Sequence, residues 1–205
     1  MKVGVLGAGN IGGTLGKRWA HAGHTVQFGV REANSPHVQA FVSELGAQAA
    51  VGTMASAIAF GDVVVFAIPG GAMEATIRTH AAALNGKIVI DAANRMGAPT
   101  MNSAAVFAAQ APSARVFRAF NSMGWENLVN PRFGDQQADL FYCGAGGDAQ
   151  VAVEQLIADA GLHPIRVGEI AQAPLVDMVT GLWFALANGQ RMGRHLAFKV
   201  LRNEN

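Results

Sequence analysis

The sequence contains few of the residues that build disulfides, multi-cysteine metal sites or strongly charged surfaces. Its 205 residues include one cysteine and one tyrosine, only 14% are charged, and the formal net charge is +1. The single cysteine, Cys143, excludes an internal disulfide and a zinc site built from several cysteines, and we predict no metal site. The near-neutral charge gives no basis for binding nucleic acid or an anionic membrane surface. We expect a compact globular protein, with Cys143 as a small core residue in a strand.

Long apolar runs are also scarce. The longest stretch without a charged residue, 96–114, contains Pro99, Asn102 and Pro112, so it is not expected to span a membrane. Met1 leads directly into a strand pattern, from which we expect no signal peptide and a cytoplasmic protein. Hydrophobic residues nevertheless make up 51% of the chain, which is enough for a substantial core and a subunit interface.

The N-terminus carries the motif around which the rest of the chain is organised. An apolar run at residues 3–6 predicts a buried strand, which breaks into glycines at positions 7, 9 and 12 just before a helix pattern. This is the context in which dinucleotides bind: the first glycine allows the turn, the second leaves room for the pyrophosphate, and the third lets the helix pack closely. N–H groups at the helix start would hold the phosphates. The predicted cofactor-binding residues here are Gly7, Ala8, Gly9, Asn10, Ile11 and Gly12.

The end of the second predicted strand, residues 24–28, indicates which dinucleotide is bound. NAD-binding proteins usually carry an Asp or Glu there to bind the ribose hydroxyls, but this chain has Gly29 and Val30, followed by Arg31. A guanidinium can clamp a 2′-phosphate with paired hydrogen bonds. We therefore predict NADP as the cofactor, with Val30 and Arg31 near its phosphate. Glu32 lies one residue beyond the position from which a carboxylate would bind the ribose. The alternative interpretation of Arg31 is a charged side chain that is solvated in a loop.

The remainder alternates between strand and helix patterns, which predicts an α/β fold with a doubly wound parallel sheet of the Rossmann type. We expect a single dinucleotide-binding domain over residues 1–205, with an NADP-binding core at about 1–122 and a C-terminal extension at 123–205 that forms the cleft for a second ligand. Further strands are expected at 48–51, 62–68, 87–91, 115–120, 140–143 and 164–167, and helices at 36–45, 53–60, 72–84, 101–111 and 148–160.

A last helix is expected at 174–201, where apolar residues recur at helical spacing. Ser35 should cap the helix that begins at Pro36. Gly189 would interrupt the last helix, and its basic end is interpreted as a solvated face. Because this helix is so apolar, we expect a homodimer that uses it.

Four segments together resemble a known family. They are the start 2–12, Gly29-Val30-Arg31, Ala67-Ile68-Pro69 and Ala119-Phe120-Asn121-Ser122. In this order they are similar to the NADP oxidoreductases that use coenzyme F420, a deazaflavin, and to the cytoplasmic domain of six-transmembrane ferric reductases. The resemblance implies NADP bound along residues 7–12 and 30–31, with the nicotinamide near Ile68 and Pro69 in a cleft roofed by the loops after Asp91 and Phe120. Val30 departs from the family's frequent Ser or Asn and removes one phosphate contact.

The usual proton donors of nicotinamide enzymes are missing from the sequence pattern. The only tyrosine, Tyr142, falls in a predicted strand with no lysine near it. The four lysines fall in the nucleotide-binding half or close to the C-terminus, away from any large helical domain. Among the histidines, His163 and His195 are interpreted as surface or capping residues. We therefore predict no catalytic acid or base.

Hydride exchange between a nicotinamide and a flavin-like ring fits this absence. Such an exchange requires two stacked rings with water excluded, and the protein supplies orientation. We predict Ile68 and Pro69 under the nicotinamide, and Asn94, Asn121 and Trp125 towards a second ring. Asn121 would bond the carboxamide or the second ligand, or serve only as a turn residue, and Trp125 would stack on a ligand or belong to the core.

The predicted function is that of an NADP(H)-dependent oxidoreductase that exchanges hydride with a deazaflavin, such as coenzyme F420, or with a flavin. The expected partner is a small-molecule redox compound. The alternatives are a non-catalytic NADP(H)-binding redox sensor or partner subunit, and a reductase of an unidentified small substrate. The direction of transfer and the role of the basic C-terminal end are left open.

Overall fold

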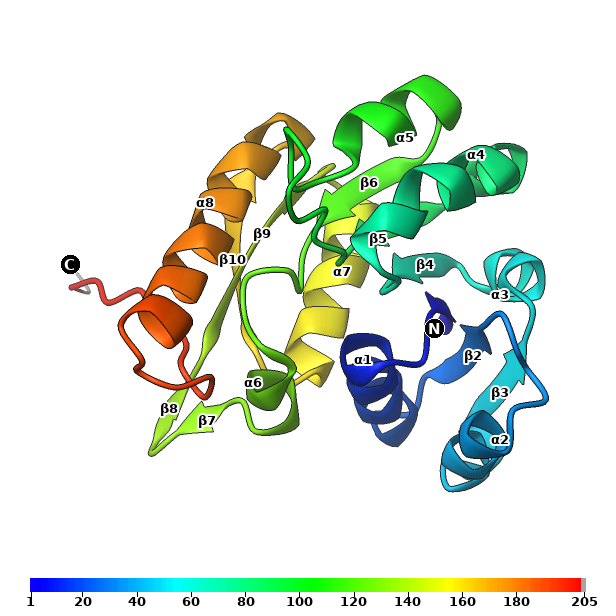
Figure 1. The fold of residues 1–205 in the computed structure, drawn as a ribbon, viewed down its shortest axis with the longest axis horizontal. Helices are drawn as coiled ribbons and strands as arrows, with labels where there is room; N and C mark the ends of the chain where they lie inside the picture. The colour runs from blue at the N-terminus through cyan, green and yellow to red at the C-terminus, as the bar shows by residue number, and fades with distance from the viewer. Residues whose placement is uncertain (204–205) are drawn as a thin grey trace.

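A computed structural model describes residues 1–203, apart from the side chain of His37, and shows a large sheet with helices on both faces (Figure 1). The strands run in the order β10-β9-β6-β5-β4-β1-β2-β3. Their bounds are β1 Lys2–Leu6, β2 Thr25–Gly29, β3 Ala49–Gly52, β4 Val63–Phe66, β5 Ile88–Asp91, β6 Arg115–Arg118, β9 Asp139–Gly144 and β10 His163–Gly168. The short strands β7 Arg132–Phe133 and β8 Gln136–Gln137 form a separate hairpin.

The helices divide into two sets because each face of the sheet is apolar. Their bounds are α1 Asn10–His21, α2 Pro36–Ser43, α3 Met54–Phe60, α4 Met73–Leu84, α5 Ala104–Gln110, α6 Trp125–Val129, α7 Asp148–Asp159 and α8 Ala173–Phe184. One core cluster joins α1, α2 and α7 to the sheet, and the other joins α3, α4 and α5. Strands β4 and β5 are buried along their whole length, as expected for parallel strands covered on both faces.

The doubly wound arrangement is confirmed. Strand β1 pairs in parallel with β2 on one side and with β4 on the other, so the strand order reverses there. Ligands of such sheets bind in the crevice at this reversal, beyond the carboxyl ends of the strands. The loops that follow β1, β2 and β4 are therefore the expected place for a ligand.

One part of the sheet departs from the expected parallel arrangement. Strand β9 runs antiparallel to β6, and β10 is parallel to β9. A parallel pair needs a crossover of a dozen or more residues, usually a helix that covers the sheet. Between β6 and β9 the chain forms only the five-residue helix α6 and the β7–β8 hairpin, so β9 enters the sheet in the opposite direction.

The predicted last helix is too long. Helix α8 ends at Phe184, a π-helical turn covers Ala185–Gly189, and residues 190–203 form no helix. After Arg191, which has a positive φ of 57°, the chain folds back along the sheet, and Phe198 forms a β-bridge with Asp139. The basic end is therefore an extended strap, residues 196–203, and not the solvated face of a helix.

The predicted helix at 101–111 is also shorter than expected, because it begins only at Ala104. The two preceding residues contact buried carboxylates: the Asn102 amide bonds Asp177, and the Ser103 backbone N–H bonds Asp91. Residues 101–103 therefore stay in a loop.

The stretch Ile170–Gly189 is the one helical segment, within the described residues, that is long and apolar enough to cross a membrane by length and composition alone. Its mean hydropathy is 1.4, and 33% of the apolar window is buried inside the protein. It contains α8, whose Asp177 pairs with a buried arginine of the sheet.

Candidate functional site

The glycine turn after β1 has the geometry that its residues predict. Gly7 has a φ of +99°, and a Cβ there would lie 2.5 Å from the carbonyl oxygen of Ala67. A Cβ at Gly12 would lie 2.1 Å from the carbonyl oxygen of Gly7, so α1 can approach the turn only with glycine at this position. At Gly9 a Cβ would meet nothing within 4 Å. Gly9 therefore borders open space, in which a phosphate can approach the backbone.

The start of α1 is suited to an anion. Its N-cap is Gly9, which offers no side chain to the first N–H groups, and the first turn carries no acidic residue. Unpaired N–H groups and the positive end of the helix dipole attract phosphate at such a position. Asn10, Ile11 and Gly12 form this first turn, although they do not line the cavity described next.

A groove of about 780 Å³ runs from the glycine turn across the ends of β2 and β4. Among the predicted cofactor residues, it is lined by Gly7, Ala8, Gly9, Val30, Arg31, Ile68 and Pro69. The structure therefore brings together the glycine motif, the predicted phosphate clamp and the predicted nicotinamide platform. An NADP molecule fits the donor set, since the groove combines backbone N–H groups, a guanidinium and an apolar end.

The groove also contains residues that were not predicted to bind the cofactor. Thr76, Thr79 and His80 line it from α4, and Ser35 lines it beside Arg31. Ser35 occupies the N-cap position of α2, as predicted, but its side chain makes no capping hydrogen bond. Its hydroxyl can therefore supply the polar contact that Val30 does not.

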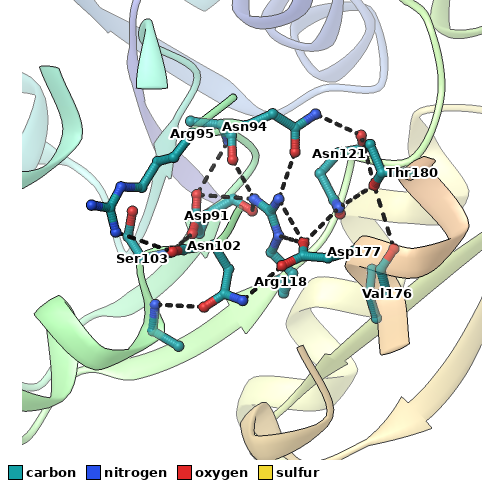
Figure 2. Close-up of polar contacts among 12 residues, drawn as sticks. Asp91, Asn94, Arg95, Asn102, Ser103, Arg118, Asn121, Val176, Asp177 and Thr180 are labelled. Carbon is teal, nitrogen blue, oxygen red and sulfur yellow. Dashed lines mark hydrogen bonds and ion pairs between the residues drawn. The ribbon is translucent and has the colours of Figure 1, made fainter. Parts of the chain in front are cut away.

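A buried ionic cluster lies beyond the carboxyl ends of β5 and β6 (Figure 2). Its centre is Arg118, whose side chain is 0% exposed. The guanidinium contacts Asp91 of β5 at 3.2 Å and Asp177 of α8 at 2.8 Å, and it donates to the Asn94 side chain at 2.6 Å. It also donates to the backbone carbonyls of Asp91 and Ala93. Arg118 thus joins three segments that are distant in the sequence.

The cluster fixes the two asparagines that the sequence predicted near the second ring. The Asn94 amide donates to the backbone carbonyl of Asn121 at 2.9 Å. The Asn121 amide donates to the Thr180 hydroxyl at 2.8 Å and to Asp177 at 3.5 Å. Its carbonyl oxygen, Oδ1, is buried and has no hydrogen-bond partner within the described part of the chain. Oδ1 of Asn121 is therefore an unsatisfied acceptor enclosed within the cluster, and neither Asn94 nor Asn121 lines the groove.

The residue before Asn121 has an unusual backbone conformation. Phe120 has a φ of +61°, which is rare for a bulky residue and costs free energy. Its ring packs edge-on against Trp19 at 5.8 Å between centroids. Strained residues persist where the surroundings hold them and concentrate at functional sites, which makes the Phe120–Asn121 turn a candidate part of the site.

The predicted site residues did not include Asp91, Arg118, Asp177 or Thr180. The role of each depends on contacts between segments that are distant in the sequence. Burial raises the pKa of Asp91, and the opposite charge of Arg118 and the N–H groups of Ser103 and Ala93 oppose this shift. The only earlier signal was that Asp91 ends an apolar strand, where a carboxylate needs a partner.

The titratable pairs of the structure lie outside the groove. Tyr142 is buried and bonds Glu154, and the histidine–carboxylate pairs are His24 with Asp159 and His163 with Asp139. None of these six residues lines the groove. Trp125 is partly buried at the start of α6.

Comparison with known proteins relates the chain to nicotinamide-dependent reductases. Residues 2–95 match the family described as NADP oxidoreductase, coenzyme F420-dependent. The metalloreductase STEAP3 of Rattus norvegicus is 26% identical over 190 residues, which cover 87% of this chain and 36% of that protein. The chain therefore spans about a third of the length of this relative.

Solved structures show the same fold. A proposed F420-dependent NADP reductase from Arthrobacter sp. FB24 is 26% identical and superimposes with a TM-score of 0.83, covering 98% of this chain and 100% of that one. A hypothetical protein from Sinorhizobium meliloti is 27% identical, with a TM-score of 0.71 over 85% of this chain and 88% of that one. An imine reductase from Aspergillus terreus, 24% identical over 93% of this chain and 61% of that one, shares the fold with a TM-score of 0.66. These comparisons confirm both the resemblance to F420-dependent NADP oxidoreductases and the predicted enzyme class, an NADP-dependent oxidoreductase.

Proposed function

We propose that this protein exchanges hydride between NADP(H) and a deazaflavin or flavin. The observation that carries the proposal is the apolar character of the groove at Ile68 and Pro69. Among the described side chains, the titratable ones that line the groove are Arg31, Glu32 and His80, and each comes from a part of the chain away from these two residues. Arg31 and Glu32 follow β2, and His80 lies about two turns into α4 from its start near Pro69. An acceptor that needs no protein acid suits such a site.

The adenosine end is proposed to hold the 2′-phosphate of NADP. Arg31 is exposed on the groove and presents a guanidinium, which binds phosphate in a bidentate manner. Ser35 adds a hydroxyl beside it. The first turn of α1 would bind the pyrophosphate through its N–H groups, and Gly9 leaves the space for it.

The nicotinamide end is proposed to lie against Ile68 and Pro69, within reach of Asn121. Ile68 is 7% exposed and gives a fixed apolar surface. Oδ1 of Asn121 can accept a hydrogen bond from a carboxamide N–H once the turn opens towards the ligand. Asn94 holds the Asn121 backbone, and Thr180 holds its amide, so the extension at residues 123–205 would contribute to the cleft through α8.

NADPH, when bound, would supply a hydride to the ring of the acceptor, and the reduced ring would take up one proton from solvent afterwards, so that atoms and charge balance. The residues of the chain are proposed to hold the two rings face to face and to exclude water. We also propose that the reaction takes place in the cytoplasm.

The test is NADPH oxidation by the purified protein, with coenzyme F420, FMN, FAD and a ferric chelate offered separately under anaerobic conditions. Turnover with F420 or a flavin is the expected result. Tight NADPH binding with no turnover on any acceptor would contradict the proposal and favour a redox sensor or partner subunit. Turnover confined to an added imine or ketone would favour a reductase of a small substrate.

We also propose a homodimer through α8. Leu175 and Leu182 lie two turns apart on one face of this helix and are 42% and 50% exposed. The only charged residue of α8, Asp177, is buried against Arg118. An uncharged apolar face can pack against its own copy without like-charge repulsion, as a two-fold interface requires. Light scattering should give a dimer mass for the wild type and a monomer mass for Leu182→Glu, and a wild-type monomer at micromolar concentration would contradict this assembly.

A further inference from the structure

A second cavity, of about 320 Å³, lies between the loop at residues 95–102 and the beginning of α8. Its walls are largely apolar and include Met96, Met101 and Met178, together with Pro99 and Pro174. Met96 and Met178 are 63% and 61% exposed. Thioether side chains adapt to the shape of a ligand and make favourable contacts with aromatic rings. The cavity is at the small end of the range for organic ligands.

Arg95 gives this apolar cavity a positive charge. Within the described part of the chain its guanidinium makes one hydrogen bond, a long one of 3.4 Å to the backbone carbonyl of Asn102. The Thr100 hydroxyl contacts the same carbonyl at 3.4 Å. Both side chains therefore keep donors that are not satisfied by strong bonds. Figure 2 shows the Arg95 side chain extending away from the Arg118 cluster.

The other charged residue of the cavity is already neutralised. Asp177 receives hydrogen bonds from Arg118 at 2.9 Å and from Asn102 at 2.7 Å. Among the described residues that line the cavity, Arg95 is thus the charge that lacks an ionic partner. An anion in this cavity would meet a cation whose charge no carboxylate within residues 1–203 compensates.

The cavity adjoins the nicotinamide end of the groove. A Cβ at Gly70 would lie 2.2 Å from the carbonyl oxygen of Asn94 and 2.7 Å from the Cα of Arg95. The loops after β4 and β5 are therefore in backbone contact at this point. Pro69 lines the groove on one side of the contact, and Arg95 lines the second cavity on the other.

We propose that this cavity is a subsite for the side chain of the second ligand, in which Arg95 binds an anionic group, a phosphate or a carboxylate, while the planar ring of the same molecule lies outside the cavity, against the nicotinamide. The proposal rests on the proposed hydride exchange and adds the residue that recognises the anionic group of the acceptor. The guanidinium supplies paired donors for the anion, and the methionines and prolines supply an apolar surface for the chain that links it to the ring.

The test compares FMN with riboflavin, which has the same ring without the phosphate. Each is titrated by quenching of flavin fluorescence in saturating NADP⁺, so that the phosphate site at Arg31 is filled. FMN should bind about 10- to 150-fold more tightly than riboflavin, as a charge-assisted hydrogen bond provides. Arg95→Ala should bring FMN to the affinity of riboflavin and leave riboflavin unchanged. Arg95→Gln, which keeps most of the side chain, should do the same.

Arg78→Ala is the matched control, because Arg78 is an exposed arginine of α4 that pairs with Glu74 outside both cavities. It should leave both affinities unchanged. Equal binding of the two flavins to the wild type, no binding of either, or a preference for FMN that survives both Arg95 variants would overturn the subsite. NADPH oxidation, measured separately with coenzyme F420 and with each flavin as acceptor, separates the two proposals: an Arg95-dependent preference for FMN with no turnover on any acceptor would leave the subsite standing and remove the proposed function.

Discussion

Arg31 is the residue on which we propose that the choice between NADP and NAD depends. It lines the groove directly after Gly29 and Val30, where NAD-binding proteins usually carry a carboxylate. Replacing it with alanine should weaken NADPH binding by about 1.5–3 kcal/mol, because a hydrogen bond to a charged phosphate is lost, and should leave NADH binding nearly unchanged. Fluorescence titration of both nucleotides checks this. Equal losses for both would mean that Arg31 has only a structural role.

Arg118 is the residue that holds the ionic cluster together. Removing it by Arg118→Met would leave Asp91 and Asp177 buried without their partner, which should cost about 3–5 kcal/mol of unfolding free energy. Urea denaturation measures the loss. Arg115→Met is the control, because Arg115 lies on the same strand but pairs with the exposed Asp148, and its replacement should change stability little. A small loss for Arg118→Met would show that the cluster does not stabilise the fold.

Cys143 should be chemically inert. It is fully buried in β9, and burial raises the pKa of its thiol to about 11. Because the thiolate is the reactive form, iodoacetamide at pH 8 should not label the native protein but should label it fully in denaturant. Mass spectrometry gives the result directly. Rapid labelling of the native protein would contradict the burial of this side chain.

At the level of elements, the C-terminal strap depends on one carboxylate. The side chain of Asp139 is 0% exposed and accepts hydrogen bonds from Lys199 at 2.7 Å, from the Val200 N–H at 2.6 Å and from His163 at 2.9 Å. Burial by itself would raise the pKa of Asp139, but these bonds together hold it below its ordinary value. Asp139 thus fastens the strap to the start of β9.

The sign of this pKa shift predicts how the strap responds to pH. A carboxylate whose pKa is lower in the folded state adds stability that is complete above its unfolded pKa, about 3.9, and is lost as the pH falls through the folded value. Hydrogen exchange of residues 196–203 should therefore stay slow from neutral pH to about pH 4 and accelerate below it, after correction for intrinsic rates. Asp139→Asn should accelerate exchange at neutral pH. A strap that is equally protected in both proteins would contradict this account.

Elements with a local signal were predictable from the sequence. The apolar run of β5 and the glycine turn before α1 can each be recognised from a few neighbouring residues. The Thr53 side chain caps α3 as expected. The direction of β9 was not predictable, because it depends on how residues 119–138 pack. The last helix was predicted to run to residue 201 with an interruption at Gly189; its helical turns end at Gly189, and the chain then turns back to reach Asp139.

The same contrast holds for the site. The motif at 7–12, Arg31 and the Ile68–Pro69 turn lie in or beside one groove, as their order along the sheet predicts. The Arg118 cluster joins Asp91 to Asp177, 86 positions apart by their numbers. No spacing rule connects these residues, so only the folded structure could identify them.

For the whole molecule, the sheet places two cavities on either side of one loop contact. Gly70 brings the loops after β4 and β5 together, with the dinucleotide groove on one side and the Arg95 cavity on the other. The buried cluster then ties α8 to the strand ends that border both. We propose that the groove holds NADP(H) and that the Arg95 cavity holds the anionic side chain of the acceptor, so that hydride passes directly between the two rings.

Direct transfer is best tested with NADPH that carries deuterium at C4 of the nicotinamide. A 5-deazaflavin is the acceptor, because its reduced ring keeps the transferred hydrogen on carbon, where it does not exchange with water. In an anaerobic single turnover, mass spectrometry should find the deuterium in the reduced deazaflavin when one C4 position of NADPH is labelled and not when the other is. Absence of reduction, or reduction without deuterium from either position, would contradict the account.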